Sequence, residues 1–576
     1  MAPLPKSSPD DPLDVVVIGC GISGLATLKC CVDAGLERTF AIERSEHLGG
    51  LWQFREKEAY GVMSFTHINV SKHNYCFSDY PFPDDTPDYP SHEQMASYIN
   101  SYAEHNRLRE RIAFGTEVTV LRRHDGPARC RATGERLWEV AVAPAGYDAG
   151  AGGRGAAPTV LYARRVAVAS GHHGAPSSAR FPGLQDGTFP GRVLHSAAFK
   201  DTDRAGLRGK RVLVVGIGNS AVDAAVNLAN NGARAVTVST RSGAWVVPNY
   251  LFGCPTDHYA CRFFLALPWK LASPIFEAVI KLHVGSPFKW GLNPKYKALQ
   301  SQPTVSGTLI YHIQRGQVKV RPNVVEFKSD GSCVFTDGSN QVFDAVVLCT
   351  GFTIDLPFLQ GELRRQCYLA EDAGGGGGGG GNAGPGGGPV LAPSNVLTLF
   401  KNVFCPEVGA SLGFVGFVQP ASGGILSMAE TQARWFAELA RGACRPLPPA
   451  RAMRADIARE NAMVARRWGS SARHTIQRDP IPYCDAIAAL FGVSLWRAVL
   501  AHPGLAWRLL LGSAGAAQWR LVGPGRWAGA ASAVRGVPVT GFMKAVGLVC
   551  GALLAPYAWR LVWWLARALA RMLFSR

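Results

Sequence analysis

The chain has 576 residues, with 60 lysines and arginines against 42 aspartates and glutamates, and a formal net charge of +18. This length predicts two or three domains with sizeable hydrophobic cores. The basic residues are not gathered into patches interleaved with aromatics, so we expect no nucleic-acid partner, and the charge favours an anionic lipid surface.

The 14 cysteines show neither metal-ligand spacing nor a C-x-x-C pair. This pattern predicts reduced thiols in a cytosol-facing protein, no metal site, and no relation to the two-nucleotide enzymes that reduce disulfides. The segment from Met1 to Asp14 is polar and proline-rich, so we expect no secretory signal peptide.

The first predicted elements form a dinucleotide-binding turn. A short apolar strand at 14–18 runs into Gly19-Cys20-Gly21-Ile22-Ser23-Gly24, and an apolar helix pattern at 25–31 and a strand at 39–42 follow. The glycines permit a tight turn and let the backbone approach a pyrophosphate at the helix N-terminus. Glu43 ends the second strand, where a carboxylate accepts a hydrogen bond from a ribose hydroxyl and repels a 2′-phosphate. The first site is therefore predicted to bind FAD or NAD.

A second turn of the same kind follows about 200 residues later. The strand at 211–215 leads into Gly216-Ile217-Gly218-Asn219-Ser220-Ala221, and the next strand, at 235–239, is followed by Thr240 and Arg241. An arginine in place of a carboxylate suits a 2′-phosphate, so this site is predicted to prefer NADPH. Two such turns in one chain indicate a flavin enzyme that receives electrons from a nicotinamide.

Two further residues near the second site each have two interpretations. Asp223 lies in the helix predicted at 220–229 and is either a contact near the nucleotide or a solvated carboxylate on the helix face. His195 either helps to orient NADPH or fixes the linker between the two nucleotide domains, and we favour the linker role.

Ordered motifs along the chain carry a more specific resemblance. Phe189-x-Gly191-x3-His195-x3-Phe199 matches the identifying motif of the class B flavin-dependent monooxygenases. From about residue 10 to the C-terminus the chain is similar to the vertebrate-type flavin-containing monooxygenases, at Gly49-Gly50-Leu51-Trp52, Phe77-Ser78-Asp79-Tyr80-Pro81-Phe82-Pro83, Cys349-Thr350-Gly351-Phe352, Gly416-Phe417-Val418-Gln419-Pro420, Gln432-Ala433-Arg434-Trp435 and Gly523-Pro524-Gly525-Arg526-Trp527.

The resemblance implies NADPH reduction of FAD and formation of a C4a-hydroperoxyflavin with O2. That species oxygenates soft small-molecule nucleophiles at nitrogen or sulfur, and the cofactor carries the hard chemistry. The chain fits this expectation, because it shows no nucleophile elbow, metal-ligand cluster or catalytic triad.

The resemblance also assigns the site residues. The active-site asparagine of the family lies in Thr-Asn-Ser-Ser-Lys, which here reads Ile68-Asn69-Val70-Ser71-Lys72, so Asn69 is the expected catalytic residue. Its changed neighbours affect the hydrogen bonding, and hence the lifetime, of the oxygenating species. The expected FAD contacts are Gly19, Cys20, Gly21, Ile22, Ser23, Gly24, Glu43, Leu51, Trp52, Asn69 and Val70, and the expected NADPH contacts are Ile68, Asn69, Gly216, Gly218, Asn219, Ser220, Ala221, Asp223 and Arg241.

Other activities stay open at this point. The altered flank of Asn69 motivates an NADPH oxidase that releases hydrogen peroxide. Baeyer–Villiger oxygenation of ketones is disfavoured because Phe199 is followed by Lys200, where that subclass has Trp-Pro. A catalytically silent membrane scaffold is disfavoured by the intact glycines of both turns.

Together the motifs predict an α/β fold with two Rossmann-like dinucleotide-binding domains, for FAD and NADPH, a helical insertion and a C-terminal apolar membrane-associated helix. The expected layout is an FAD domain at 1–170 and 331–450, an NADPH domain at 171–330 with the insertion at about 243–308, a membrane-facing helical region at 451–541 and an anchor at 542–576. The insertion departs from the family at Ser306–His312, so the substrate route is expected to differ. The glycine-rich loop at 373–389 and a hairpin tip between Pro144 and Pro158 are expected to be flexible surface segments.

The C-terminal segment predicts membrane association. Residues 545–559 are apolar or small, Arg560 interrupts them, and Arg560, Arg567 and Arg571 share one helical face beside Trp563 and Trp564. This pattern favours a helix that enters a membrane and then lies along its surface, with a soluble amphipathic helix docked on the core as the alternative. The resemblance implies C-terminal anchoring in the endoplasmic reticulum membrane, and homo-oligomerisation is left open.

Overall fold

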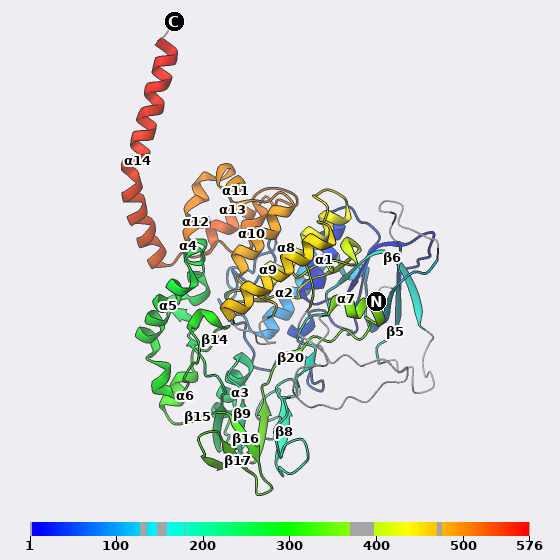
Figure 1. Ribbon diagram of the computed structural model, residues 1–576, viewed down its shortest axis with the longest axis vertical. Helices are drawn as coiled ribbons and strands as arrows, with labels where there is room; N and C mark the ends of the chain where they lie inside the picture. Colours follow the sequence, from blue (N-terminus) through cyan, green and yellow to red (C-terminus); the bar gives the residue numbers. More distant parts are fainter. Residues whose placement is uncertain are drawn as a thin grey trace.

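The computed structural model describes residues 3–126, 134, 136–146, 158–177, 179–368, 397–468 and 475–574. Two α/β units form most of the body, and a long C-terminal helix projects away from it (Figure 1). The glycine-rich segment 373–389 and most of the hairpin tip expected between Pro144 and Pro158 lie outside the described residues.

The first unit is built on a seven-stranded sheet in the order β3-β2-β1-β6-β5-β4, with β21 also paired to β6. Its central strand β1 is almost wholly buried and apolar, as expected for a parallel strand covered on both faces. The strands are β1 (Leu13–Ile18), β2 (Thr39–Ile42), β3 (Ile112–Ala113), β4 (Thr116–Arg123), β5 (Trp138–Pro144), β6 (Thr159–Val168) and β21 (Leu412–Phe414).

Helices α1 and α8 pack against each other beside this sheet and supply much of its core. Every residue of α8 from Leu426 to Ala440 is buried, including charged ones. Arg434 of α8 donates to the carbonyl oxygens of Trp519 (2.8 Å) and Pro524 (2.7 Å), which joins two of the sequence motifs. The helices of this unit are α1 (Ile22–Asp33), α2 (His92–His105), α7 (Gly361–Cys367) and α8 (Ile425–Ala440).

The second unit is a five-stranded parallel sheet in the order β15-β10-β9-β19-β8. It extends past residue 330, where we expected the NADPH domain to end, because β19 pairs with both β9 and β8. Its elements are β8 (Arg192–His195), β9 (Arg211–Val215), α3 (Asn219–Asn230), β10 (Ala235–Ser239), β15 (Val318–Arg321) and β19 (Ala345–Leu348), with the antiparallel strands β16 (Val324–Phe327), β17 (Ser332–Phe335) and β18 (Asn340–Val342) beside it. A short pair, β7 (Ala175–Pro176) and β20 (Phe352–Thr353), lies in the connections between the two units.

The insertion between β10 and β15 holds helices and short strands. In Figure 1 it lies on the same side of the molecule as the C-terminal helices. Its elements are β11 (Val246–Val247), β12 (Tyr250–Leu251), β13 (Cys254–Pro255), α4 (Arg262–Ala266), α5 (Trp269–Val284), β14 (Thr304–Val305) and α6 (Leu309–Gln314).

The C-terminal region is helical up to the last described residues. It contains α9 (Ala450–Trp468), α10 (Pro480–Leu490), α11 (Leu495–Ala501), α12 (Ala506–Leu511), α13 (Ala530–Gly536) and α14 (Gly541–Phe574), with the short pair β22 (Gln419–Pro420) and β23 (Gln477–Arg478) nearby. Among the described residues no single helix has the length and apolar character needed to cross a membrane, although α10 and α11, bent at 83°, pass that test as a pair.

Candidate functional site

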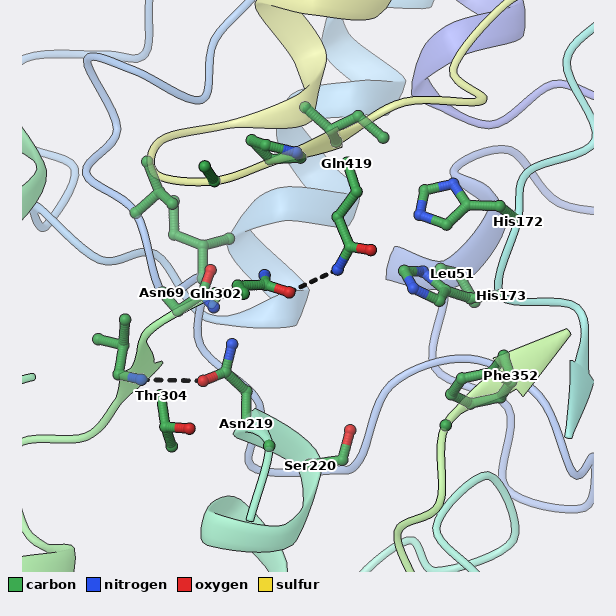
Figure 2. A pocket seen from close by; sticks show the side chains of 18 of the residues that line it. Leu51, Asn69, His172, His173, Asn219, Ser220, Gln302, Thr304, Phe352 and Gln419 are labelled. Atoms are coloured by element: carbon green, nitrogen blue, oxygen red, sulfur yellow. Dashed lines mark hydrogen bonds between the residues drawn. The ribbon is translucent and has the colours of Figure 1, made fainter. Parts of the chain in front are cut away.

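A cavity of ≈ 2210 Å³ is lined by both glycine turns, the Asn69 segment and the helical insertion. Pockets for a single drug-sized ligand measure about 300–1,000 Å³, so this cavity has room for more than one. Among the residues that line it are Leu51, Asn69, His172, Asn219 and Gln419 (Figure 2).

The first turn depends on glycine at two positions. Gly19 has a φ of +96°, and a Cβ atom there would lie 2.8 Å from the carbonyl oxygen of Ala169. A Cβ at Gly24 would lie 1.8 Å from the carbonyl oxygen of Gly19, because the helix crosses directly over the turn. The turn therefore brings the backbone and the N-terminus of α1 to the cavity without side chains in between.

Glu43, at the end of β2, has its carboxylate fixed by backbone groups. The amide of Cys20 donates to Oε2 at 2.6 Å, and the amide of Ser45 donates to Oε1 at 2.8 Å. Glu43 is buried by its neighbours but still lines the cavity. Its side chain is thus held beside the turn in one orientation.

The second turn is fastened to the end of the insertion. Gly216 has a φ of +125°, and a Cβ there would lie 2.5 Å from the carbonyl oxygen of Cys349. The amide of Val305 donates to Asn219 Oδ1 at 2.9 Å, and the Thr304 hydroxyl donates to the Ile217 carbonyl at 2.7 Å. The insertion and the nucleotide turn therefore meet at one corner of the cavity.

Two charged groups of the second unit line the cavity. Arg241 is exposed, as an arginine that receives a ligand phosphate from solvent would be. Asp223, on α3, is partly buried, and burial raises the pKa of its carboxyl from 3.8 to about 7. Asp223 thus lines the cavity and is not a fully solvated carboxylate; its contact with the nucleotide stays a prediction.

Three amide side chains gather where the two units meet the insertion. Asn69, Gln302 and Gln419 all line the cavity, and the Gln419 amide donates to Gln302 Oε1, which joins the first unit to the insertion (Figure 2). Ile68 and Val70 on either side of Asn69 are buried. Leu51 and Trp52 lie in the 3-10 helix Gly50–Trp52 and also line the cavity.

Two histidines after β6 also reach the cavity. Burial lowers the pKa of His172 to about 4, so its ring is not readily protonated. Its Nδ1 contacts the Gly416 carbonyl at 3.1 Å. The His173 ring lies 4.0 Å from that of His172 and 5.5 Å from Phe352. His195 is different, since its Nε2 contacts the Gly351 carbonyl at 3.1 Å and its Nδ1 accepts from the Ala197 amide at 3.2 Å. Backbone groups occupy both of its nitrogens, as the linker role requires.

The insertion contributes apolar side chains to the cavity. Side chains of the insertion line it, among them Phe263, Phe264, Phe276 and Val279. Met543, in the first turn of α14, closes the wall; it is 1% exposed, and its Sδ lies 3.5 Å from Cys261 Sγ.

Sequence reasoning missed several of these residues. His172 and His173 follow the strand that pairs with β1, and that position at the end of a parallel strand was a usable signal. Gln419 stood in a motif but received no role, and no pattern pointed to Gln302, whose position depends on the path of the insertion.

The fold and the site define a class of protein, the flavin oxidoreductases with two dinucleotide sites. Two glycine turns without obstructing side chains, a carboxylate at one strand end and an arginine at the other fit FAD and NADPH.

Comparison with known proteins identifies the family. Residues 13–369 and 390–540 match the family model described as flavin-binding monooxygenase-like, and the chain belongs to this family. It is 33% identical to human flavin-containing monooxygenase 5 over 538 residues, which cover 90% of this chain and 91% of the relative. It is 34% identical to dimethylaniline monooxygenase [N-oxide-forming] 2 of Cavia porcellus over 534 residues, with 90% of each chain covered. The protein is therefore an enzyme that uses FAD and NADPH.

Solved structures share its fold. S-allyl-L-cysteine S-oxygenase from Allium sativum matches with a TM-score of 0.56 at 19% identity, covering 83% of this chain and 88% of that one. An open structure of cyclohexanone monooxygenase matches with a TM-score of 0.54 at 18% identity, covering 83% and 97%.

Proposed function

We propose that this enzyme oxygenates amine nitrogen or sulfur in small nucleophilic substrates, using NADPH and O2. Each turnover consumes NADPH, a proton, O2 and the substrate, and yields NADP⁺, water and the oxygenated substrate. The observation that carries the proposal is that one cavity is lined by both glycine turns, by Asn69 and by apolar side chains of the insertion. Bound flavin supplies the electron transfer and the activation of O2.

The protein's own residues bind and orient these groups. We assign the FAD site to residues 19–24, Glu43, Leu51, Trp52, Asn69 and Val70. We assign NADPH to Ile68, Asn69, Gly216, residues 218–221, Asp223 and Arg241. We place the boundary of the NADPH domain after Leu348, since β19 completes its sheet.

Asn69 is the residue to which we assign direct participation in oxygen transfer. Its amide lines the cavity and changes no charge when it donates a hydrogen bond to a cofactor. The apolar walls keep water out, which protects the reaction from releasing peroxide. We expect Asn69→Ala to leave flavin reduction nearly unchanged while the yield of product per NADPH falls.

The test of the proposed function is NADPH consumption by the detergent-purified enzyme, with and without N,N-dimethylaniline or a thioether. Product and hydrogen peroxide are quantified in the same samples. Product that rises in step with NADPH consumption supports oxygenation. Peroxide that accounts for all NADPH with every substrate would overturn it in favour of an oxidase, the alternative that the altered flank of Asn69 motivates.

We also propose attachment to the endoplasmic reticulum membrane through α14. Trp559, Trp563 and Trp564 are 74%, 56% and 63% exposed, and tryptophan is favoured at a membrane interface. Leu282 on α5 and Leu500 on α11 are also exposed apolar side chains. Flotation with anionic lipid vesicles tests this proposal: wild type should float, and a variant with all three tryptophans changed to alanine should float less. Equal flotation would exclude these side chains as the attachment.

A further inference from the structure

Polar side chains fix the segment that follows Asn69. The Lys72 ammonium donates to the carbonyl oxygens of Asp84, at 2.9 Å, and Thr86. Ser71 and Asn74 both donate to a single carboxylate, that of Asp257. Because Ser71 is fully buried and lies two residues from Asn69, whatever fixes Ser71 also limits where the Asn69 amide can lie.

Asp257 reaches this segment from the helical insertion. It lies in the 3-10 helix Thr256–Tyr259, 186 residues along the chain from Ser71. Its Oδ1 accepts from the Ser71 amide at 3.2 Å, and its Oδ2 accepts from the Ser71 hydroxyl at 2.7 Å and from Asn74 Nδ2 at 2.6 Å. Hydrogen bonds to a carboxylate are stronger than those between neutral groups, so Asp257 is a strong anchor of the segment at Ser71 and Asn74, alongside the backbone hydrogen bond from the Lys72 amide to the Asp88 carbonyl.

The neighbouring His258 locks the Ser71 hydroxyl. Its Nε2 lies 2.9 Å from Ser71 Oγ. The hydroxyl hydrogen already points to Asp257, so the imidazole must donate through Nε2 to the serine oxygen. His258 is fully buried, and burial lowers its pKa, which keeps the ring neutral. An imidazole that donates to a serine cannot remove its proton, so this group holds the backbone and does not form a nucleophile.

The same carboxylate is connected to the C-terminal region. The Asn74 amide that donates to Asp257 also donates to Ser513 Oγ at 3.0 Å, and the Ser513 hydroxyl lies 3.1 Å from Asn74 Oδ1. Asp257 thus joins the Asn69 segment, the substrate wall and the C-terminal helices at one point.

We infer that Asp257 is a positioning residue for Asn69. By holding Ser71 through its backbone and its side chain, it fixes the Asn69 amide at the cofactors and so sets the share of NADPH that yields oxygenated product. This inference rests on the role proposed above for Asn69. Loss of the carboxylate should release the segment, and a shift of about 1 Å in a positioned group is enough to reduce a rate ~100-fold.

The test uses full-length enzyme with bound FAD, NADPH and N,N-dimethylaniline, and compares wild type with Asp257→Ala. We expect the yield of product per NADPH to fall about tenfold, with hydrogen peroxide replacing the lost product. Anaerobic flavin reduction by NADPH should stay within about twofold of wild type, which a general loss of structure would not allow. Wild-type product yield in Asp257→Ala would overturn the inference.

Two further variants keep the test decisive. If Asp257→Ala does not retain FAD, Ser71→Ala takes its place, because it removes only the hydroxyl; wild-type yield in that variant would again overturn the inference.

Asp88→Asn is the matched control, since Asp88 also ties the insertion to the first unit, by accepting from the Tyr250 hydroxyl at 2.9 Å, but its side chain does not hold the Asn69 segment. An equal loss of yield in Asp88→Asn would contradict a specific role for Asp257.

A double variant links the effect to Asn69. Asn69→Ala combined with Asp257→Ala should lose no more yield than Asn69→Ala alone, because both act through one amide. Independent, multiplicative losses would overturn the inference while leaving the proposed function in place. A wild-type enzyme that forms no product would overturn the proposed function, and this inference with it.

Discussion

The two nucleotide-binding turns share one fold but differ in how completely their surroundings are fixed. At the first turn, Gly24 packs against Gly19, and two backbone amides hold the Glu43 carboxylate in place. At the second turn, Ala221 already carries the Cβ that Gly24 lacks, and the charged group at the strand end, Arg241, is exposed. A rigid, buried site suits a cofactor that stays bound, and an open site suits one that is exchanged in each cycle.

The largest expected effect comes from filling the first turn. In Gly24→Ala, the new Cβ would lie 1.8 Å from the Gly19 carbonyl oxygen, so the turn must distort. We expect loss of bound FAD and a decrease of about 3 kcal/mol in the free energy of unfolding. Flavin absorbance per protein and thermal unfolding measure both. Ala221→Gly, the reverse change in the second turn, should retain FAD and lower the free energy of unfolding by only ~1 kcal/mol. If Gly24→Ala also retained FAD, the two turns would not differ in the way described above.

The next effect is expected from Glu43→Gln. The change keeps the shape but removes the charge that two backbone amides and a ribose hydroxyl would share. Since hydrogen bonds to charged groups contribute about 1.5–3 kcal/mol each, FAD should bind ~100-fold more weakly. Titration of FAD into the flavin-free protein gives the dissociation constant. The KM for NADPH should stay at its wild-type value. If the dissociation constant of FAD and the KM for NADPH rose by the same factor, the effect of Glu43 would not be specific to the FAD site.

A smaller effect is expected from Arg241→Ala in the open site. Removing one exposed cation should raise the KM for NADPH about 20-fold, because the 2′-phosphate loses its partner, and leave the KM for NADH nearly unchanged. Steady-state kinetics with both nicotinamides measure this. Arg208→Ala is a suitable control, since Arg208 is an exposed arginine of the same unit whose Nη2 is paired with Asp203 at 2.8 Å. Equal effects on NADPH and NADH would refute the phosphate assignment.

The smallest effect concerns pH. The pKa of Asp223 is raised from 3.8 to about 7, so the carboxyl is neutral in the native state below pH 7 and charged above it. This group therefore lowers the free energy of unfolding as pH rises from about 4 to 7. The charge gained near pH 7 should also weaken NADP⁺ binding about fivefold, equivalent to ~1 kcal/mol. Calorimetric titration with NADP⁺ from pH 6 to 8 measures this change in affinity. The variant Asp223→Asn should lose this part of the pH dependence of NADP⁺ binding. If the variant showed the same pH dependence as wild type, Asp223 would lie away from the nucleotide.

The same contrast separates what the sequence could predict from what it could not. Strand, glycine turn, helix and strand follow one another locally, so β1, α1, β9 and α3 were predicted within a few residues. Glu43 and Arg241 were predicted to lie at the site because their distance from a turn is fixed by the length of one helix and one strand, and both line the cavity.

Residues brought in by long connections could not be found in this way. Gln302 and Asp257 reach the cavity from an insertion whose path depends on tertiary packing, and Asp257 meets Ser71 across 186 residues. The end of the second unit was missed for a similar reason, since β19 returns to its sheet only after three antiparallel strands. The C-terminal segment was expected to be a helix that enters a membrane and then lies along its surface; the structure has one helix from Gly541 to Phe574, and its relation to a membrane stays a prediction.

The position of Met543 has a practical consequence for shortening the chain. The first turn of α14 belongs to the cavity wall through Met543, whose sulfur contacts that of Cys261, and Gly547 faces Trp507 and Leu511 of α12. Farther along, Leu548, Val549 and Tyr557 are exposed. A crystallisation or expression variant that ends soon after residue 551 would keep the wall, whereas one that ends at 541 would remove Met543 from it.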